Sequence, residues 1–245
     1  AVDLLKLVTD LLEERNLLQF AAQLADNPKV CVPRTFPDLC TSRVLTMEWL
    51  DGIKIAETDR LRAAGIDLEE IARRGAGLYI EMIFTHGFYH ADPHPGNILL
   101  LPGNIIGLLD FGMVGRIDDR LRETIEEMLL AVASRDTSLL TMLIKRVGNT
   151  PPRLDESLLS IDVADLIGNY GSQPLDSFDL SGALNDVTEI MRRHQISLPP
   201  QTSLLIKMLI TLEGTLRQLS PHFSLLEVMQ PFFRRMWLRR LSPKR

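Results

Sequence analysis

Apolar residues recur at every third or fourth position over most of this chain, which is the spacing of one buried face of an α-helix. The first such stretch covers residues 2–25, and Asn27-Pro28 ends it. Residues 30–32 and 43–49 are instead rich in branched side chains and are bounded by prolines and by Asp51-Gly52, which favours short β-strands. The pattern therefore predicts one helix, or two abutting helices, and then a few strands in the first fifty residues or so.

A longer helix is predicted to begin at Asp67 and to end near His86-Gly87. Asp67 and Glu70 have the spacing of a capping box, in which each side chain bonds a backbone N–H of the first turn. The apolar positions that share one face are Leu68, Ile71, Ala72, Gly75, Leu78, Tyr79, Met82 and Ile83. We interpret this stripe as core that braces the segment after it.

Beyond Gly115 the pattern is almost entirely helical. Helices are predicted over residues 118–132, 139–147, 184–194 and 200–219, with Pro199-Pro200 suited to a helix start. The stretches 148–153 and 169–179 carry Gly, Pro and Ser and are expected to be connections within one domain. The predicted fold class is mainly α with a small β component.

Composition narrows the function classes. The chain has 245 residues, of which 45% are hydrophobic and 24% charged, as in an ordinary folded protein. A net charge of −5 argues against a nucleic-acid partner, because such proteins need a basic face. No apolar run is long enough for a membrane span. Cys31 and Cys40 suit free thiols in a reducing compartment, and a single disulfide is the alternative.

The chemistry is concentrated in residues 90–97, with the sequence His-Ala-Asp-Pro-His-Pro-Gly-Asn, and in Asp110-Phe111-Gly112. A kinase catalytic loop places an Asp to accept the proton of the acceptor hydroxyl and, five residues on, an Asn for a metal ion. A later Asp-Phe-Gly holds Mg²⁺ across the phosphates. Asp92, Asn97 and Asp110 have this order and spacing, so they are the candidate catalytic residues.

The residues between these groups support one compact site. Pro93 and Pro95 restrict the backbone and Gly96 permits a tight turn. Residues 97–101 and 105–109 flank Pro102-Gly103-Asn104 and are predicted to form a β-hairpin. That hairpin would return Asp110 to Asn97, so that two oxygen ligands meet at one Mg²⁺ ion.

A zinc site formed by His86, His90 and His94 is the competing interpretation of the same stretch. The three histidines lie four residues apart, which would suit one helical face. Pro93 and Pro95 do not permit a helix through His94, and the glutamate of the H-E-x-x-H motif is missing. His90 is expected instead to hold the backbone around Asp92.

The loop H-x-D-P-H-P-G-N followed by L-D-F-G-M-V-G resembles the UbiB family of atypical, protein-kinase-like proteins, also called aarF-domain kinases. Residues 44–52, with the sequence V-L-T-M-E-W-L-D-G, and 211–214, T-L-E-G, resemble that family as well. The resemblance covers the chain from about Glu13 onwards. It implies a protein-kinase-like fold, ATP and Mg²⁺ as cofactors, and a role in ubiquinone and other prenyl-lipid metabolism at a membrane.

The resemblance also suggests nucleotide-side residues. Glu13 to Asn16 match the family's E-A-x-N segment, whose Glu pairs with the ATP-binding lysine; an exposed helix glutamate is the alternative. Residues 47–50 resemble a kinase hinge, with the Glu48 carbonyl and the Leu50 N–H as adenine contacts and Met47 behind them. As a plain edge strand they would need no ligand. The phosphate-covering loop, the strand lysine, and the family's K-x-G-Q and E-x-D elements are not found.

Residues 1–52 are accordingly predicted to be the end of a small lobe with the hinge, and residues 53–245 a helical C-terminal lobe. We expect the chain to be part of a longer protein. Residues 231–241, with bulky apolar side chains and paired arginines, are predicted to lie on an anionic membrane surface; a packed helix with a basic face is the alternative. The expected location is membrane-associated, on the cytoplasmic face in a bacterium or in an organelle.

Partners implied by the resemblance are a nucleotide, a membrane phospholipid or prenyl-lipid precursor, and a lipid-biosynthesis protein complex. Two other functions stay open. A choline- or aminoglycoside-type phosphotransferase has a similar loop and a helical lobe. A pseudokinase scaffold would keep the fold without turnover, although the intact Asp92, Asn97 and Asp110 argue against a decayed site.

Overall fold

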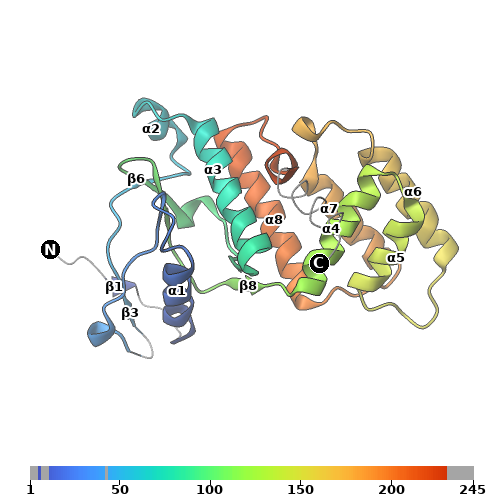
Figure 1. Ribbon diagram of the computed structural model, residues 1–245, viewed down its shortest axis with the longest axis horizontal. Helices are drawn as coiled ribbons and strands as arrows, with labels where there is room; N and C mark the ends of the chain where they lie inside the picture. The colour runs from blue at the N-terminus through green and yellow to red at the C-terminus, as the bar shows by residue number, and fades with distance from the viewer. Residues whose placement is uncertain (1–4, 7–10, 42–43, 231–245) are drawn as a thin grey trace, which may run out of the picture.

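A computed structural model of the chain describes residues 5–6, 11–41 and 44–230. The fold is mainly helical, with short strands gathered near the N-terminal end and a group of helices at the other (Figure 1). The helices are α1 (Leu11–Gln23), α2 (Thr58–Ala63), α3 (Leu68–Glu81), α4 (Asp119–Ala133), α5 (Thr137–Val147), α6 (Glu156–Tyr170), α7 (Leu180–Arg193) and α8 (Pro200–Leu219). The predicted fold class, a kinase-like lobe that is mainly α, is confirmed.

The strands form one four-stranded sheet and two pairs. They are β1 (Leu5–Lys6), β2 (Val30–Cys31), β3 (Leu45–Thr46), β4 (Ile53–Lys54), β5 (Phe88–His90), β6 (Ile98–Leu101), β7 (Ile105–Leu108) and β8 (Val114–Arg116). The sheet order is β2-β7-β6-β4, with β2 parallel to β7 and the other neighbours antiparallel. β1 pairs with β3, and β5 pairs with β8. β2 precedes residue 52 and β4 follows it, yet both belong to this sheet. The domain boundary predicted between residues 52 and 53 stays a prediction.

The predicted hairpin is confirmed. β6 and β7 pair antiparallel, with Ile98 opposite Leu108 and Leu101 opposite Ile105. The connecting residues Gly103 and Asn104 both have positive φ, which glycine and asparagine tolerate better than other residues. The hairpin therefore carries the chain out from the catalytic loop and back to Asp110.

The helix predicted from Asp67 is confirmed as α3, which continues through a π-helical turn at Met82–His86 to Gly87. The Asp67 carboxylate accepts hydrogen bonds from the N–H groups of Glu69 and Glu70, as an N-cap residue should. The other half of the capping box was wrong, because the Glu70 carboxylate pairs with Arg74 on the next turn. The interpretation of the apolar face as core is correct: seven of its members are buried and Gly75 lies close to Leu216 of α8.

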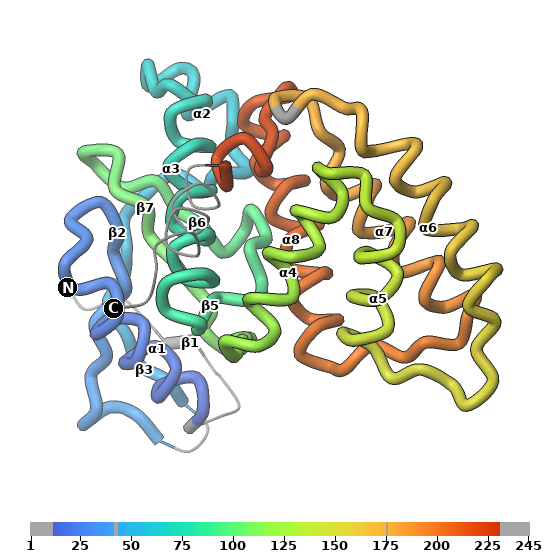
Figure 2. Tube along the Cα trace, turned by 45° about the vertical axis from the view of Figure 1, so that its right-hand side comes forward, coloured from blue at the N-terminus to red at the C-terminus, as the bar shows by residue number. Residues whose placement is uncertain are grey.

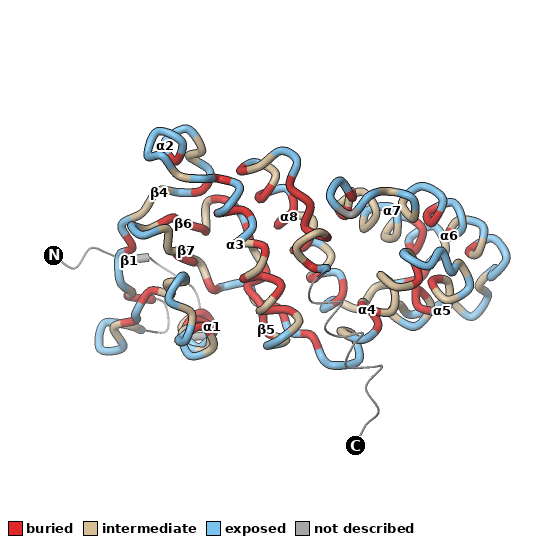
Figure 3. Tube along the Cα trace, turned by 45° about the horizontal axis from the view of Figure 1, so that its top comes forward, coloured by how far each residue is buried: buried red, intermediate tan, exposed pale blue. Residues whose placement is uncertain are grey.

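Two clusters of buried apolar residues fill the interior. The larger one is shared by α1, α3, α8 and the strands, and the smaller one is shared by α4, α5, α6 and α7. Figure 2 shows these last four helices together at one end, with α8 running between them and α3. In Figure 3 the buried segments concentrate on α3, β5 and α8, so the centre of the molecule is the best-covered part.

Several predicted boundaries differ from the observed ones. α7 begins four residues before the predicted start, because Asp179 accepts a hydrogen bond from the Gly182 N–H and caps it. No element was predicted over α2 or α6; α6 is apolar on more than one side, which hides its helical period. Leu5 and Lys6 lie within the helix predicted over residues 2–25 but form the strand β1, which pairs with β3. The strand predicted over residues 43–49 is shorter than expected, because only Leu45–Thr46 forms β3. The predicted membrane-surface segment, residues 231–241, lies outside the described residues.

Candidate functional site

The catalytic loop is held between two strands that pair with each other. β5 leads into the loop and β8 follows the Asp-Phe-Gly segment, with Tyr89 opposite Gly115. The Ala91 N–H donates to the Met113 carbonyl at 3.0 Å, which extends this pairing into the site. At the other end, the Leu109 N–H donates to the Asn97 carbonyl at 2.8 Å. The loop and Asp110 are thus fixed to each other from both sides.

Asp92 and Asn97 contact each other directly. The Asn97 Nδ2 group donates to Asp92 Oδ2 at 2.8 Å. Because an amide offers donors only on its nitrogen, this bond leaves the side-chain oxygen Oδ1 of Asn97 as the atom suited to a cation. The loop turn is supported by His94, whose Nδ1 accepts from the Gly96 N–H at 3.1 Å. The sequence did not predict this contact between Asp92 and Asn97; the roles of Asp92 towards an acceptor hydroxyl and of Asn97 towards a metal ion stay predictions.

His90 joins the two halves of the site. Its Nε2 lies 3.0 Å from the Leu109 carbonyl oxygen and 2.8 Å from that of Asp110, and its Nδ1 accepts from the Asp92 N–H at 3.3 Å. Since carbonyl oxygens only accept, Nε2 carries the proton and the ring is neutral. Burial lowers the pKa of His90, and the carbonyls and the charges of Asp92 and Asp110 oppose that effect. A neutral imidazole therefore spans the catalytic loop and the metal-side segment.

This geometry does not support the zinc alternative. His90 directs both ring nitrogens at backbone groups, His94 caps its own turn, and His86 lies 3.8 Å from Glu81. Among the residues that the structure describes, no group of three His, Cys, Asp or Glu side chains could hold a metal ion. The hard oxygen atoms of Asn97 and Asp110 are the donor set that this site offers.

Asp110 adopts a left-handed backbone conformation, with φ of 58°. Such values are uncommon for residues other than glycine and occur often at functional sites. The Asp110 Oδ1 atom accepts from the Gly112 N–H at 3.3 Å, which stabilises the turn. The conformation follows from the constraints on its neighbours, because its carbonyl is bonded to His90 and the next residue is held by α1.

Helix α1 holds the Asp-Phe-Gly segment through both backbone groups of Phe111. The Phe111 N–H donates to Glu13 Oε1 at 3.1 Å, and the Phe111 carbonyl accepts from Asn16 Nδ2 at 2.9 Å. Glu13 and Asn16 lie three residues apart, so they share one face of the helix. Glu13 is 2% exposed. The alternative of an exposed helix glutamate is thus wrong, whereas pairing of Glu13 with a lysine stays a prediction.

The aromatic ring of Phe111 also anchors the Asp-Phe-Gly segment. It is fully buried and packs against Phe20 of α1 and against His90, with ring centroids 5.4 Å and 5.6 Å apart. Phe20 also stacks on Phe88 of β5 at 4.5 Å. Both the backbone and the side chain of Phe111 are therefore tied to α1, so movement of that helix would move Asp110.

Two contacts from α8 were not predicted as part of the site. The Thr215 hydroxyl donates to the Pro93 carbonyl at 2.9 Å inside the core. Glu213, which is fully buried, accepts from the Ser181 N–H at 2.6 Å and so holds the start of α7. Both residues lie in or next to the T-L-E-G segment at 211–214. An acidic and a hydroxyl-bearing residue at apolar positions of a helix were the feature of the sequence that could have indicated these buried contacts.

The hinge candidates Met47, Glu48 and Leu50 lie between β3 and β4. Leu50 is buried, close to Gly107 of β7, and Met47 packs at the edge of the larger cluster. The Glu48 Oε2 atom accepts a hydrogen bond from the Arg34 N–H at 3.3 Å. Within the described part of the chain, no hydrogen bond uses the Glu48 carbonyl or the Leu50 N–H. The adenine contacts of these two backbone groups stay a prediction.

Comparison with known proteins agrees with this geometry. Residues 5–143 match the ABC1 atypical kinase-like domain, and residues 163–224 match the UbiB helical domain. The chain is similar to two uncharacterized proteins. It is 31% identical over 232 residues to slr1919 of Synechocystis sp. and 32% identical over 220 residues to a protein encoded in the hydrogenase 1 5' region of Clostridium pasteurianum. These alignments cover 95% and 90% of the chain but 41% of each relative.

A solved structure shares the fold. It is Rv3197 of Mycobacterium tuberculosis in complex with erythromycin, with a TM-score of 0.63 and 21% identity over 91% of this chain and 57% of that one. The kinase-like match alone spans more than half of the chain, and the helical match follows it in order. The chain therefore belongs to the UbiB family of ABC1 atypical kinase-like proteins.

Proposed function

We propose that this chain carries the catalytic centre of an ATP- and Mg²⁺-dependent atypical kinase or ATPase of the UbiB type, which supports ubiquinone biosynthesis at a membrane. The observation that carries the proposal is that the buried, neutral His90 imidazole bonds the backbones of both Asp92 and Asp110, and that Asp92 in turn bonds Asn97. A buried polar side chain is costly unless its groups are satisfied, so the placing of His90 between these partly exposed side chains favours a chemical role.

Magnesium fits the donor set at this site. Mg²⁺ prefers oxygen ligands. The side chains of Asn97 and Asp110 supply an amide oxygen, Asn97 Oδ1, and a carboxylate. When bound, the ion would neutralise charge on the phosphate oxygens. The chain's own contribution is to fix both ligands before the nucleotide arrives, since His90 bonds the Asp110 carbonyl and Asp92 bonds the Asn97 amide.

Asp92 is placed to handle the proton of the acceptor. Its Oδ2 atom is engaged by Asn97, so Oδ1 is the atom left for a hydroxyl group or a water molecule. Accepting that proton in the transition state is worth about 10²- to 10⁴-fold in rate in typical enzymes. An ATPase transfers the phosphoryl group to water and a kinase transfers it to another molecule. The Asp92 carboxylate could accept the proton of the acceptor in either reaction.

Nucleotide binding is tested by thermal denaturation of the chain with ADP or ATP, with and without Mg²⁺. A ligand that binds only the folded state raises its stability, by about 2.7 kcal/mol at a concentration of 100 Kd. We expect a rise that needs Mg²⁺ and is lost in Asp110→Asn. Asp165→Asn, an exposed position on α6, is the matched control. Mg-nucleotide binding by Asp110→Asn as tight as that of the wild type would contradict the proposal.

Turnover separates the enzyme from a scaffold. In the protein with its complete nucleotide lobe, Asp92→Asn is expected to retain Mg-nucleotide binding and to lower the rate of phosphate release by about 100-fold or more. Turnover with choline or an aminoglycoside, and none with water, would favour a soluble phosphotransferase. Binding without turnover in the wild type would favour the scaffold.

Membrane association belongs to the same proposal and rests on the family and on the basic, apolar residues 231–241. Within the described residues, no helix is long and apolar enough to cross a bilayer. Binding would therefore involve a surface contact with anionic phospholipid or a prenyl-lipid precursor, in company with lipid-biosynthesis proteins. Co-sedimentation with phosphatidylglycerol vesicles that is lost at high salt would support it.

A further inference from the structure

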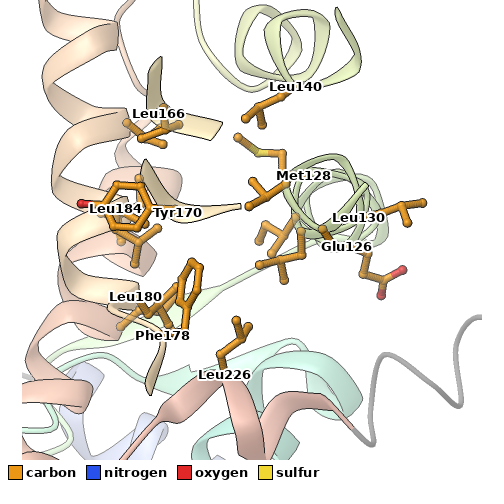
Figure 4. A pocket seen from close by; sticks show the side chains of 18 of the residues that line it. Glu126, Met128, Leu130, Leu140, Leu166, Tyr170, Phe178, Leu180, Leu184 and Leu226 are labelled. Carbon is orange, nitrogen blue, oxygen red and sulfur yellow. The ribbon is translucent and has the colours of Figure 1, made fainter. Parts of the chain in front are cut away.

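A cavity of about 600 Å³ lies between the two apolar clusters of the molecule. Its walls come from α4, α5, α6, α7 and α8, together with Leu226 and Gln230 beyond α8. Figure 4 shows Met128 and Leu140 facing Leu166, Tyr170 and Leu184 across it, with Phe178, Leu180 and Leu226 closing one end. It is separate from the catalytic centre, because none of Asp92, Asn97 and Asp110 lines it.

The cavity wall consists of side chains that would otherwise be core. Met128 and Leu129 on α4 and Leu184 and Val187 on α7 are only partly buried, although each belongs to the apolar face of its helix. Protein interiors are normally packed as densely as organic crystals, with few voids larger than a water molecule. A void of this size leaves many dispersion contacts unmade, so an occupant that restored them would be favoured.

The lining also determines what could enter. Among the described lining residues Glu126 is the one that carries a charge, and Figure 4 shows its carboxylate, like the Tyr170 hydroxyl, directed away from the cavity. The other polar lining residues are Gln173, Thr202 and Gln230. Water does not fill apolar cavities, since it finds too few partners there. A nucleotide or a sugar would lose its hydrogen bonds to water without replacement. The volume falls within the range of small-molecule sites, which are about 300–1,000 Å³.

We propose that this cavity is a binding site for a neutral lipophilic molecule that has a long apolar chain and a hydroxyl group. The chain lies among the apolar side chains of α4 and α7. The hydroxyl bonds to the side chain of Thr202, which lines the cavity from α8; the Tyr170 hydroxyl points away from the cavity and donates to Asp186 Oδ2 at 2.8 Å (Figure 4). This site is independent of nucleotide binding, so either can be lost without the other.

The test is a fluorescence titration of the 245-residue chain with diphenylhexatriene, a neutral rod-shaped probe that emits in apolar surroundings. We expect saturable binding that dodecanol displaces. In Ala183→Phe the added ring would fill the cavity, and the dissociation constant for the probe should rise about tenfold or more. Ala164→Phe adds the same ring at an exposed position of α6 and should bind as the wild type does.

Equal binding by Ala183→Phe and Ala164→Phe, or no saturable binding by the wild type, would overturn the proposal. Should Ala183→Phe fail to melt cooperatively, Val187→Phe takes its place at the same wall. Residues 231–245 directly follow Gln230 and are the competing occupant. If a chain ending at Gln230 binds the probe and the full chain does not, the cavity belongs to that segment and the proposal fails.

Discussion

The two apolar clusters of the molecule, the larger one around the catalytic loop and the smaller one formed by α4 to α7, differ in how they are packed. Around the catalytic loop the core encloses polar groups, namely His90, Glu13, Asn16 and Thr215, and each bonds a backbone group of the site. The smaller cluster formed by α4, α5, α6 and α7 is built from apolar side chains and borders a cavity. The first region therefore holds the catalytic loop in one conformation, and the second contains unfilled space between its helices.

This difference shows how one chain can hold both a rigid centre and an adaptable one. Buried hydrogen bonds fix distances and angles, because an unsatisfied group in the interior costs about 1–3 kcal/mol. Dispersion contacts between apolar helices are weakly directional and tolerate a gap or a guest. Substitutions in the two regions should therefore differ in size and in what they affect.

The largest effect is expected from Phe20→Ala. Phe20 is fully buried and its ring contacts Phe88, Phe111 and His90. Its removal leaves a cavity in a close-packed region, which typically costs about 3–5 kcal/mol of unfolding free energy. Urea denaturation followed by circular dichroism measures it. A loss below about 1 kcal/mol would show that this region is as loosely packed as the other.

Glu13→Ala should have the next largest effect, about 2 kcal/mol, because it leaves the buried Phe111 N–H without its charged acceptor. Glu13→Gln keeps an acceptor oxygen and should recover part of that loss. Both are measured by urea denaturation, with Glu14→Ala on the same helix as a control. Equal losses for the alanine and glutamine variants would mean that the hydrogen bond contributes nothing.

The pH dependence of stability provides a third comparison. Because burial lowers the pKa of His90 in the folded state, the unfolded chain binds a proton first as the pH falls below about 6.5. The contribution of neutral His90 to stability is complete above that pH and is lost as the pH decreases towards the folded-state pKa. The slope is at most about 1.4 kcal/mol per pH unit.

Urea denaturation between pH 7.5 and pH 5 tests this, with His90→Asn as the comparison. The wild type should lose more stability than the variant over this range, because the variant has no imidazole to protonate. His194, which lies 2.8 Å from Asp162 in the helical part, is the control position. His194→Asn should retain the pH dependence that His90 causes; parallel curves for wild type and His90→Asn would exclude the assignment.

The smallest effect is expected from Leu129→Ala at the cavity wall. Leu129 is only partly buried, so its truncation enlarges an existing space and removes fewer contacts, at about 1 kcal/mol or less. Leu143→Ala in the closed part of the smaller cluster should cost about 2–4 kcal/mol by contrast. The two are compared by thermal denaturation, and equal losses would show that the cavity is not open in solution.

The sequence was sufficient for the parts of the fold that depend on local rules. The proline and glycine positions around Asp92, the two strands of the hairpin and the apolar stripe of α3 specify their own conformations, and all three were predicted. Local spacing also placed Asp92 and Asn97 on one loop. Glu70 shows the limit of such rules, because a capping-box spacing lost to an ion pair with Arg74 one turn later.

The tertiary structure decided what depends on distant residues. The contact of Asn16 with Phe111 joins positions 95 residues apart, and that of Thr215 with Pro93 joins positions 122 apart. No periodicity reports such pairs, because they depend on how α1 and α8 pack. The cavity is the clearest case. Its lining residues follow the helical pattern of ordinary core, and only the packing of five helices, α4 to α8, leaves the space between them unfilled.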